Sequence, residues 1–176
     1  VLTEASVRVT RAPASERFVG VFFPDWAGAV AAARRLAQAR LGLSMLRLAN
    51  PAETHTTLTM AGHASAIAWL ERYLSLRGVG DGKCLLLAGL TGDSAGAVRS
   101  LQRAAAAIWR AHGGVATGTL LGRKWAQRRF ANVYLRNALW DAGYAVDTME
   151  AACDWPRIDA MVAALEQAGG AALAQH

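Results

Sequence analysis

Cysteine and long apolar runs are both scarce in this sequence of 176 residues. The two cysteines, Cys84 and Cys153, are too few and too far apart to form a disulfide framework or a cysteine-based metal site. No apolar run approaches the roughly 20 residues that a membrane-spanning helix needs, and the first residues lack the basic and apolar regions of a secretory signal. We therefore expect a cytoplasmic protein with no transmembrane segment and no bound metal.

Lysine is rare as well: 17 of the 19 basic side chains are arginine, against 13 acidic ones, which gives a net charge of +6. Hydrophobic residues make up 53% of the chain, including 39 alanines, and this composition excludes intrinsic disorder. The abundance of Ala, Gly and Arg is typical of a GC-rich bacterial genome. Nucleic-acid-binding proteins are basic too, but their charge is clustered, whereas these arginines are dispersed. We expect no nucleic-acid partner.

An initiator methionine is absent, and residues 1–9 alternate between apolar and polar side chains like a strand. We interpret the chain as a piece of a larger protein. Its length fits one compact domain, or one domain with a tail.

Hydrophobic periodicity predicts an alternation of strands and helices. The predicted strands cover residues 18–23, 44–48, 83–90 and 144–149, with a short extended piece at 115–117. The predicted helices cover residues 26–40, 63–76, 95–112, an arginine-rich stretch at 120–140 and a segment that begins at 154. Residues 91–94 are a turn and cap, residues 52–62 fit a strand, a short helix or a loop, and residues 169–176 are a frayed tail. This order predicts an α+β fold, a mostly antiparallel sheet covered by helices, with a ferredoxin-like core.

Two glycine-containing segments resemble phosphate-binding loops only superficially. Residues 78–83 precede a strand, whereas a phosphate-binding loop follows one, and Cys84 stands where that loop requires Ser or Thr. Residues 91–94 follow a strand and open a helix, so their N–H groups have the arrangement for binding an anion, although a capped turn is the simpler interpretation. None of the four histidines has the spacing of a metal site.

The arginine-rich stretch is the best candidate for binding chemistry. Arg129 and Arg136 are seven residues apart, which places them on one face of a helix. Two guanidinium groups on one face can clamp a carboxylate or a phosphate; a solvated basic face is the alternative interpretation. Asp147 and Glu150 are suited to support these arginines rather than to perform acid–base catalysis, because they do not form an isolated carboxylate pair.

A longer motif follows from the same region. Residues 122–137 read GRKWAQRRFANVYLRN, residues 143–150 read GYAVDTME, and Trp155 follows. This order resembles the FAD-linked oxidases of the vanillyl-alcohol oxidase type. Within that family it resembles the branch of alkyldihydroxyacetonephosphate synthase (alkylglycerone-phosphate synthase) and its bacterial relatives. That branch has Tyr-Leu/Ile-Arg-Asp, then Gly, then Asp-Thr-Leu-Glu-Thr and a Trp. The resemblance extends over residues 2–166.

The resemblance implies a division of the chain. Residues 1–15 would be the last strand of a truncated FAD-binding domain, and residues 16–168 the cap, or substrate-binding, domain. FAD would be bound mainly by a domain outside this sequence, with Leu2 and Thr3 as the candidates for a contact with it. The chain alone would be inactive. A homodimer is the assembly that we consider for the protein.

The resemblance also implies roles for individual residues. Arg136 matches the arginine of the family's Tyr-x-Arg motif, which implies that it holds a substrate phosphate or carboxylate and stabilises developing negative charge. Arg129 and Tyr134 complete the substrate-binding set, and Asp147 and Glu150 support it. The family pattern changes at three positions: Val133 replaces a common Pro or Ala, Asn137 replaces Asp, and Ala151 replaces Thr.

Two reactions are compatible with the resemblance. The first is oxidation of a hydroxy acid, an alcohol or a phenol by FAD. The second is a synthase reaction without net redox change, in which an alkoxy group replaces the acyl group of an acyl-dihydroxyacetone phosphate. A non-enzymatic ferredoxin-like module that binds a ligand or nucleic acid is the alternative class.

Overall fold

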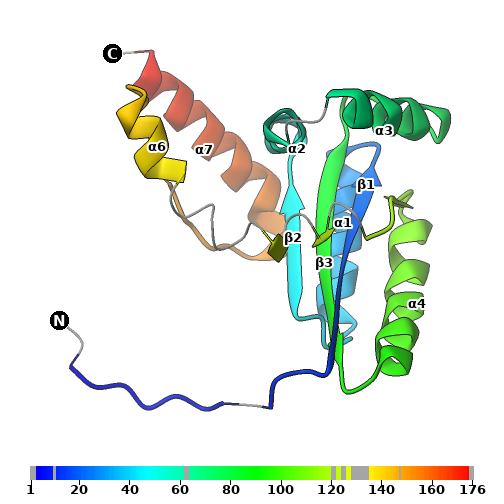
Figure 1. Ribbon diagram of the computed structural model, residues 1–176. Coiled ribbons are helices and arrows are strands. Elements are labelled where there is room, and N and C mark those ends of the chain that lie inside the picture. Colours follow the sequence, from blue (N-terminus) through cyan, green and yellow to red (C-terminus); the bar gives the residue numbers. More distant parts are fainter. Residues whose placement is uncertain are drawn as a thin grey trace. The chain divides into compact units, whose positions relative to one another are not determined.

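The computed structural model describes residues 3–9, 11–61, 64–119, 122–123, 126–127, 135–146 and 148–174 (Figure 1). The chain divides into two compact units, residues 1–130 and residues 131–176. The cap domain expected at residues 16–168 spans both units and stays a prediction.

The first unit is built on a sheet of four strands. Their order is β2 (Met45–Ala49), β3 (Cys84–Gly92), β1 (Ser15–Phe23) and β4 (Val115–Ala116), and every neighbouring pair is antiparallel. Each half of the unit runs strand, helix, strand, as in the ferredoxin-like βαββαβ arrangement. The predicted α+β fold with a ferredoxin-like sheet is therefore confirmed.

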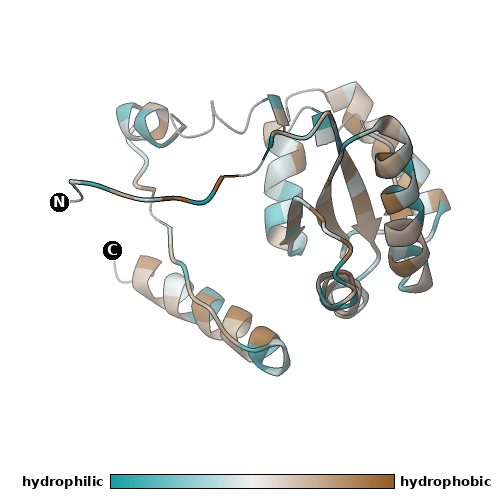
Figure 2. Ribbon diagram, turned by 90° about the horizontal axis from the view of Figure 1, so that it is seen from below, coloured by the Kyte–Doolittle hydropathy of each residue, from teal (hydrophilic) through white to brown (hydrophobic). Residues whose placement is uncertain are grey.

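One face of the sheet is covered by two helices, α1 (Trp26–Gln38) and α4 (Ala95–Ala111), which also contact each other. Successive side chains of a strand point to opposite faces. Every side chain from Phe18 to Phe23 except that of Gly20 is apolar and buried, so β1 contributes to a core on each face. Figure 2 shows the hydrophobic residues concentrated on the strands and hydrophilic patches on the surrounding helices. This is the pattern of a central strand covered on both sides.

The opposite face is partly covered by α2 (Pro51–Met60) and α3 (Ala64–Leu76), which connect β2 to β3. These two helices and the sheet share one buried cluster, which consists of Phe22, Ala49, Leu58, Leu74, Val79, Leu85 and Leu87. The ammonium group of Lys83 lies 3.3 Å from the carboxylate of Glu71 and ties α3 to the beginning of β3. The connection is thus packed onto the sheet rather than looped away from it.

The ambiguity at residues 52–62 is resolved as a helix by its first turn. The Asn50 side chain accepts the Glu53 N–H at 2.8 Å, and Pro51 occupies the first helical position, where its missing N–H costs nothing. The other helix ends follow similarly local signals. Asp25 caps α1 and Ser94 caps α4, while Gly113, with φ of 80°, follows the end of α4.

Several predicted boundaries differ from the structure. Strand β1 begins at Ser15, three residues before the strand predicted at 18–23. Strand β3 continues to Gly92, so Thr91 and Gly92 are paired with β1 rather than forming a turn. Helix α1 ends at Gln38, because Arg40 adopts a left-handed conformation with φ of 48°. Helix α2 begins at Pro51, one residue before the ambiguous segment.

The second unit contains α6 (Leu135–Asp141), a 3₁₀ turn η2 (Trp155–Arg157) and α7 (Ile158–Leu173). The predicted strand at 144–149 is wrong: the described residues 144–146 and 148–149 form no strand. Alternating side chains make a strand only where a neighbour completes the hydrogen bonds, and Tyr144 and Met149 are both exposed. Residues 169–173, expected in a frayed tail, are helical. The described part of the arginine-rich stretch is helical at 122–123, 126–127 and 135–140.

Thr54 joins α2 to the sheet through its hydroxyl group. Its side chain is fully buried, its Oγ1 accepts the Leu85 N–H at 2.9 Å, and the same hydroxyl donates to the Ala49 carbonyl oxygen at 3.3 Å. The hydroxyl therefore bridges the end of β2 and the beginning of β3. The acceptor of the Leu85 N–H is therefore a side chain and not the backbone of a neighbouring strand.

Replacing Thr54 by Val should destabilise the protein by about 1 to 3 kcal/mol, because the isosteric side chain leaves the buried Leu85 N–H without an acceptor. Urea unfolding measures the change. Thr57→Val on the exposed face of the same helix is the matched control and should change the free energy of unfolding little. Equal effects of the two substitutions would contradict the bridging role of Thr54.

Candidate functional site

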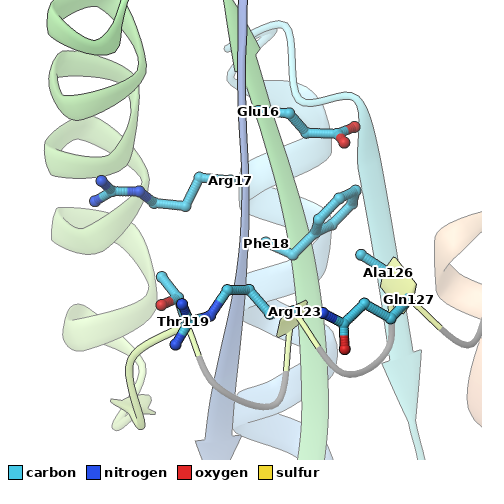
Figure 3. Close-up of a pocket in the computed structure, with 7 residues that line it drawn as sticks. All are labelled: Glu16, Arg17, Phe18, Thr119, Arg123, Ala126 and Gln127. Atoms are coloured by element: carbon cyan, nitrogen blue, oxygen red, sulfur yellow. The ribbon is translucent and has the colours of Figure 1, made fainter.

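A pocket of about 490 Å³ lies in the first unit, at the end of the sheet away from α2. One wall is the beginning of β1 and the other is the segment that follows β4 (Figure 3). The lining residues are Glu16, Arg17, Phe18, Thr119, Arg123, Ala126 and Gln127. The volume is in the range of sites for small organic ligands, about 300 to 1,000 Å³.

The second wall lies directly against β1 because a glycine permits it. A Cβ atom at Gly122 would collide with the carbonyl oxygen of Phe18 and lie 2.7 Å from its Cβ. Just before this contact, the Thr117 N–H donates to the Gly20 carbonyl oxygen at 3.0 Å. Gly122 is thus needed for close approach rather than for a special backbone conformation.

Phe18 supplies the apolar surface of the pocket. Its ring is 5% exposed and lies over Gly89, its partner residue on β3. A Cβ atom at Gly89 would lie 3.0 Å from that ring and 2.9 Å from the Cβ of Met45. A side chain at position 89 would therefore displace the ring from the sheet.

The two arginines of the pocket are held differently. Arg17 points away from Phe18 (Figure 3), and its Nη1 donates to Gln102 Oε1 on α4 at 2.8 Å. The Arg123 guanidinium makes no hydrogen bond or ion pair with another side chain in the described part of the chain. Arg123 is therefore the cation available to an incoming ligand, with the Thr119 hydroxyl and the Gln127 amide as neutral partners.

The lining side chains are suited to binding a polar ligand. They include the guanidinium groups of Arg17 and Arg123, the carboxylate of Glu16, a hydroxyl, an amide and an aromatic ring, and the described lining residues contain no histidine or cysteine. Glu16 makes an interaction of its own, and Arg123 is the side chain suited to hold the anionic end of a ligand. Three of the lining residues, Arg123, Ala126 and Gln127, belong to the arginine-rich stretch predicted at 120–140. The strand residues Glu16, Arg17 and Phe18 were missed, because their role appears only when the segment at 119–127 packs on them.

The predicted site residues are described only in part. Arg136 lies on α6, and its guanidinium carbon is 4.7 Å from the centroid of the Trp140 ring. Glu150 is exposed, and no ion pair joins it to Arg136. Thr3 is exposed in a segment outside any strand or helix. The other predicted residues, which are Leu2, Arg129, Tyr134 and Asp147, lie outside the described residues. The site roles of all seven stay predictions.

The described residues contain no group of three or more His, Cys, Asp or Glu side chains with the arrangement of a metal site. No described helix is both long and apolar enough to span a membrane.

The two cysteines differ sharply in environment. Cys84 is buried at the beginning of β3, whereas Cys153 is exposed. Burial and, to a smaller extent, the Asp25 carboxylate raise the pKa of the Cys84 thiol from 9.0 to about 11. Because the thiolate is the reactive form, Cys84 is expected to be chemically inert near neutral pH.

A maleimide reagent at neutral pH should label Cys153 rapidly in the folded protein and Cys84 only after unfolding. Mass spectrometry of the labelled peptides measures this, and Cys153→Ser should abolish the rapid reaction. Rapid labelling of Cys84 in the folded protein would contradict its burial.

The raised pKa of the Cys84 thiol also predicts a pH dependence of the stability. The folded state favours the protonated thiol, so its contribution to stability is complete below about pH 9 and is lost as the pH rises to about 11.

Comparison with known proteins identifies a family match over nearly the whole chain. The C-terminal domain of FAD linked oxidases matches residues 12–173. The alkyldihydroxyacetonephosphate synthase of Dictyostelium discoideum is 24% identical over 168 residues, which cover 92% of this chain and 27% of that protein.

Two solved structures of an alkyldihydroxyacetonephosphate synthase share the fold. The first has a TM-score of 0.72 at 22% identity and covers 89% of this chain and 31% of that one. The second has a TM-score of 0.60 at 21% identity, with coverages of 72% and 24%. The chain therefore spans 24–31% of the length of these relatives.

Proposed function

Since the chain belongs to the family of FAD linked oxidases, whose C-terminal domain it carries, we propose that it is the substrate-binding (cap) part of an FAD-dependent enzyme. FAD is the cofactor that this family indicates for the parent protein. The family match over residues 12–173 takes support away from the alternative of a non-enzymatic ferredoxin-like module. The proposal includes a cytoplasmic location, a bacterial source, a homodimer and the absence of a nucleic-acid partner.

The described residues do not fit a whole FAD molecule. Helix N-termini with free N–H groups are common sites for a pyrophosphate, and at the N-terminus of α4 the Ser94 side chain already accepts the Ala97 N–H at 3.1 Å. The adjacent Asp93 would in addition repel the phosphates. We therefore expect this chain alone to be inactive and to contribute the substrate side of the site.

The observation that carries the proposed substrate role is a cation without a carboxylate partner, Arg123, at the wall of a pocket with an aromatic surface. A pocket of this kind holds the anionic end of a molecule by charge and its apolar part by contact with Phe18. Arg136 is proposed to bind a phosphate or carboxylate group of the same substrate class. Arg129 and Tyr134, which are near it in sequence, complete this set, and Asp147 and Glu150 support it. In this role the arginines orient the substrate and stabilise negative charge, and they transfer no proton.

Two reaction classes fit such a substrate. The name of the relatives points to a synthase that acts on a dihydroxyacetone phosphate derivative, whose anionic end is a phosphate. The family name points to oxidation, for which a hydroxy acid would supply a carboxylate. An arginine fork accepts either group bidentately.

The absorption spectrum of the enzyme that contains this domain distinguishes the two classes. We expect visible flavin bands. Anaerobic bleaching by a hydroxy acid or an alcohol identifies a redox enzyme, because the substrate has then been oxidised. A spectral change that only an acyl-dihydroxyacetone phosphate causes identifies a synthase. A colourless protein that takes up no FAD would overturn the proposed function.

Arg136→Ala and Arg123→Ala in that enzyme should each raise the KM for an anionic substrate by roughly 10- to 100-fold, since a charge-assisted hydrogen bond contributes about 1.5 to 3 kcal/mol. Steady-state kinetics measures the change. Arg103→Ala removes an exposed arginine of α4 that lies outside the pocket, and it should leave kcat and KM unaltered. If turnover and KM are unchanged in Arg136→Ala, the anion-binding role of Arg136 is wrong.

A further inference from the structure

The guanidinium group of Arg136 lies over an aromatic ring rather than beside a carboxylate. Arg136 and Trp140 are four residues apart on α6, which places both side chains on the same face of the helix. The guanidinium carbon lies 4.7 Å from the ring centroid, inside the roughly 6 Å within which a ring face attracts a cation. In the described part of the chain, no other interaction of the Arg136 side chain occurs.

This contact leaves the hydrogen-bond donors of the guanidinium unused. The guanidinium carbon lies over the Trp140 ring, and no hydrogen bond from Arg136 to another described side chain is present. Arg136 therefore keeps the fork of N–H donors with which an arginine binds a carboxylate or a phosphate bidentately. Arg77 shows the contrast: it lies 5.9 Å from the Tyr73 ring, and its Nη1 donates to the Tyr73 hydroxyl at 3.4 Å.

The backbone that carries Trp140 is itself fixed. Helix α6 ends in a Schellman motif, in which Gly143 has φ of 85°. The Gly143 N–H donates to the Trp140 carbonyl oxygen at 2.9 Å, and the Tyr144 N–H donates to the Leu139 carbonyl oxygen at 2.8 Å. The last turn of the helix therefore fixes the backbone from which the Trp140 side chain projects, and about half of that residue is exposed.

We propose that Trp140 is a positioning residue for anion recognition, whose ring presents the fork of Arg136 to the carboxylate or phosphate of the substrate. The inference rests on the proposed function of Arg136 as an anion-binding residue. A free arginine side chain loses rotamer freedom when it binds an anion, and the stack removes part of that cost before the anion arrives. Loss of the ring should therefore weaken anion binding by roughly 3- to 30-fold, which corresponds to the range of cation–π energies.

NMR titration of this chain with inorganic phosphate, and then with acetate, tests the inference. The upfield ring-current shift of the Arg136 Nε–H signal reports the stack, and the shifts of the α6 amide signals give the affinity. Trp140→Ala should lose the upfield shift and bind phosphate 3- to 30-fold more weakly. Trp140→Phe should restore both in part, which a merely structural loss would not do. Trp69→Ala, which removes an exposed tryptophan of α3, should match the unchanged chain.

The outcomes separate the inference from the proposed function. If Arg136→Ala weakens phosphate binding but Trp140→Ala does not, the positioning role is overturned and the anion-binding role of Arg136 stands. If Arg136→Ala binds as tightly as the unchanged chain, or if the unchanged chain shows no shift of α6 signals with either anion, both are overturned. Unaltered amide shifts outside α6 in Trp140→Ala show that the variant is folded.

Discussion

The pairing of β1 with β3 is the constraint on which the first unit depends. The two strands pair without interruption from Ser15 opposite Gly92 to Phe23 opposite Cys84. Because the side-chain period of a strand is two, a slip by one residue would exchange the two faces of the sheet. The register places Phe22 opposite Leu85, in the cluster beneath α2 and α3, and Phe18 opposite Gly89, where the missing side chain leaves room for the ring. The register of β1 and β3 therefore determines both the apolar cluster at one end of this sheet face and the pocket at the other end.

The same alignment explains why a pocket forms at one end only. At the first end, α2 and α3 are attached closely, by apolar contacts and by the Thr54 hydroxyl. At the other end, the covering segment touches β1 at Gly122, and the larger side chains of Thr119, Arg123 and Gln127 stand around that contact. A segment that touches the sheet at a glycine and is flanked by polar side chains encloses a polar-walled space over an apolar surface. This is the usual composition of a ligand site.

Local signals in the sequence predicted the elements that have local causes. The apolar run of β3, the caps at Asp25 and Ser94 and the glycine at 113 each determine their neighbourhood by themselves. Helix α2 was ambiguous because its threonines favour several structures, and its buried Thr54 is explained only by a hydrogen bond to Leu85, which is 31 residues away. The pocket residues of β1 were missed for the same reason. Arg136 was found through a family motif, whereas its stack on Trp140 follows from helical spacing and was overlooked.

The use of arginine at these positions has a physical basis beyond the composition of the chain. Arg17 donates to Gln102, and the guanidinium carbon of Arg136 lies over the Trp140 ring. Lysine would keep the charge at either position, but its compact ammonium group has no fork to share between two oxygens. An arginine that already donates a hydrogen bond has fewer donors left for a ligand, whereas Arg123 and Arg136 donate none to another side chain in the described part of the chain. On this ground Arg17 shapes the pocket, while Arg136 and Arg123 are the residues suited to receive an anion.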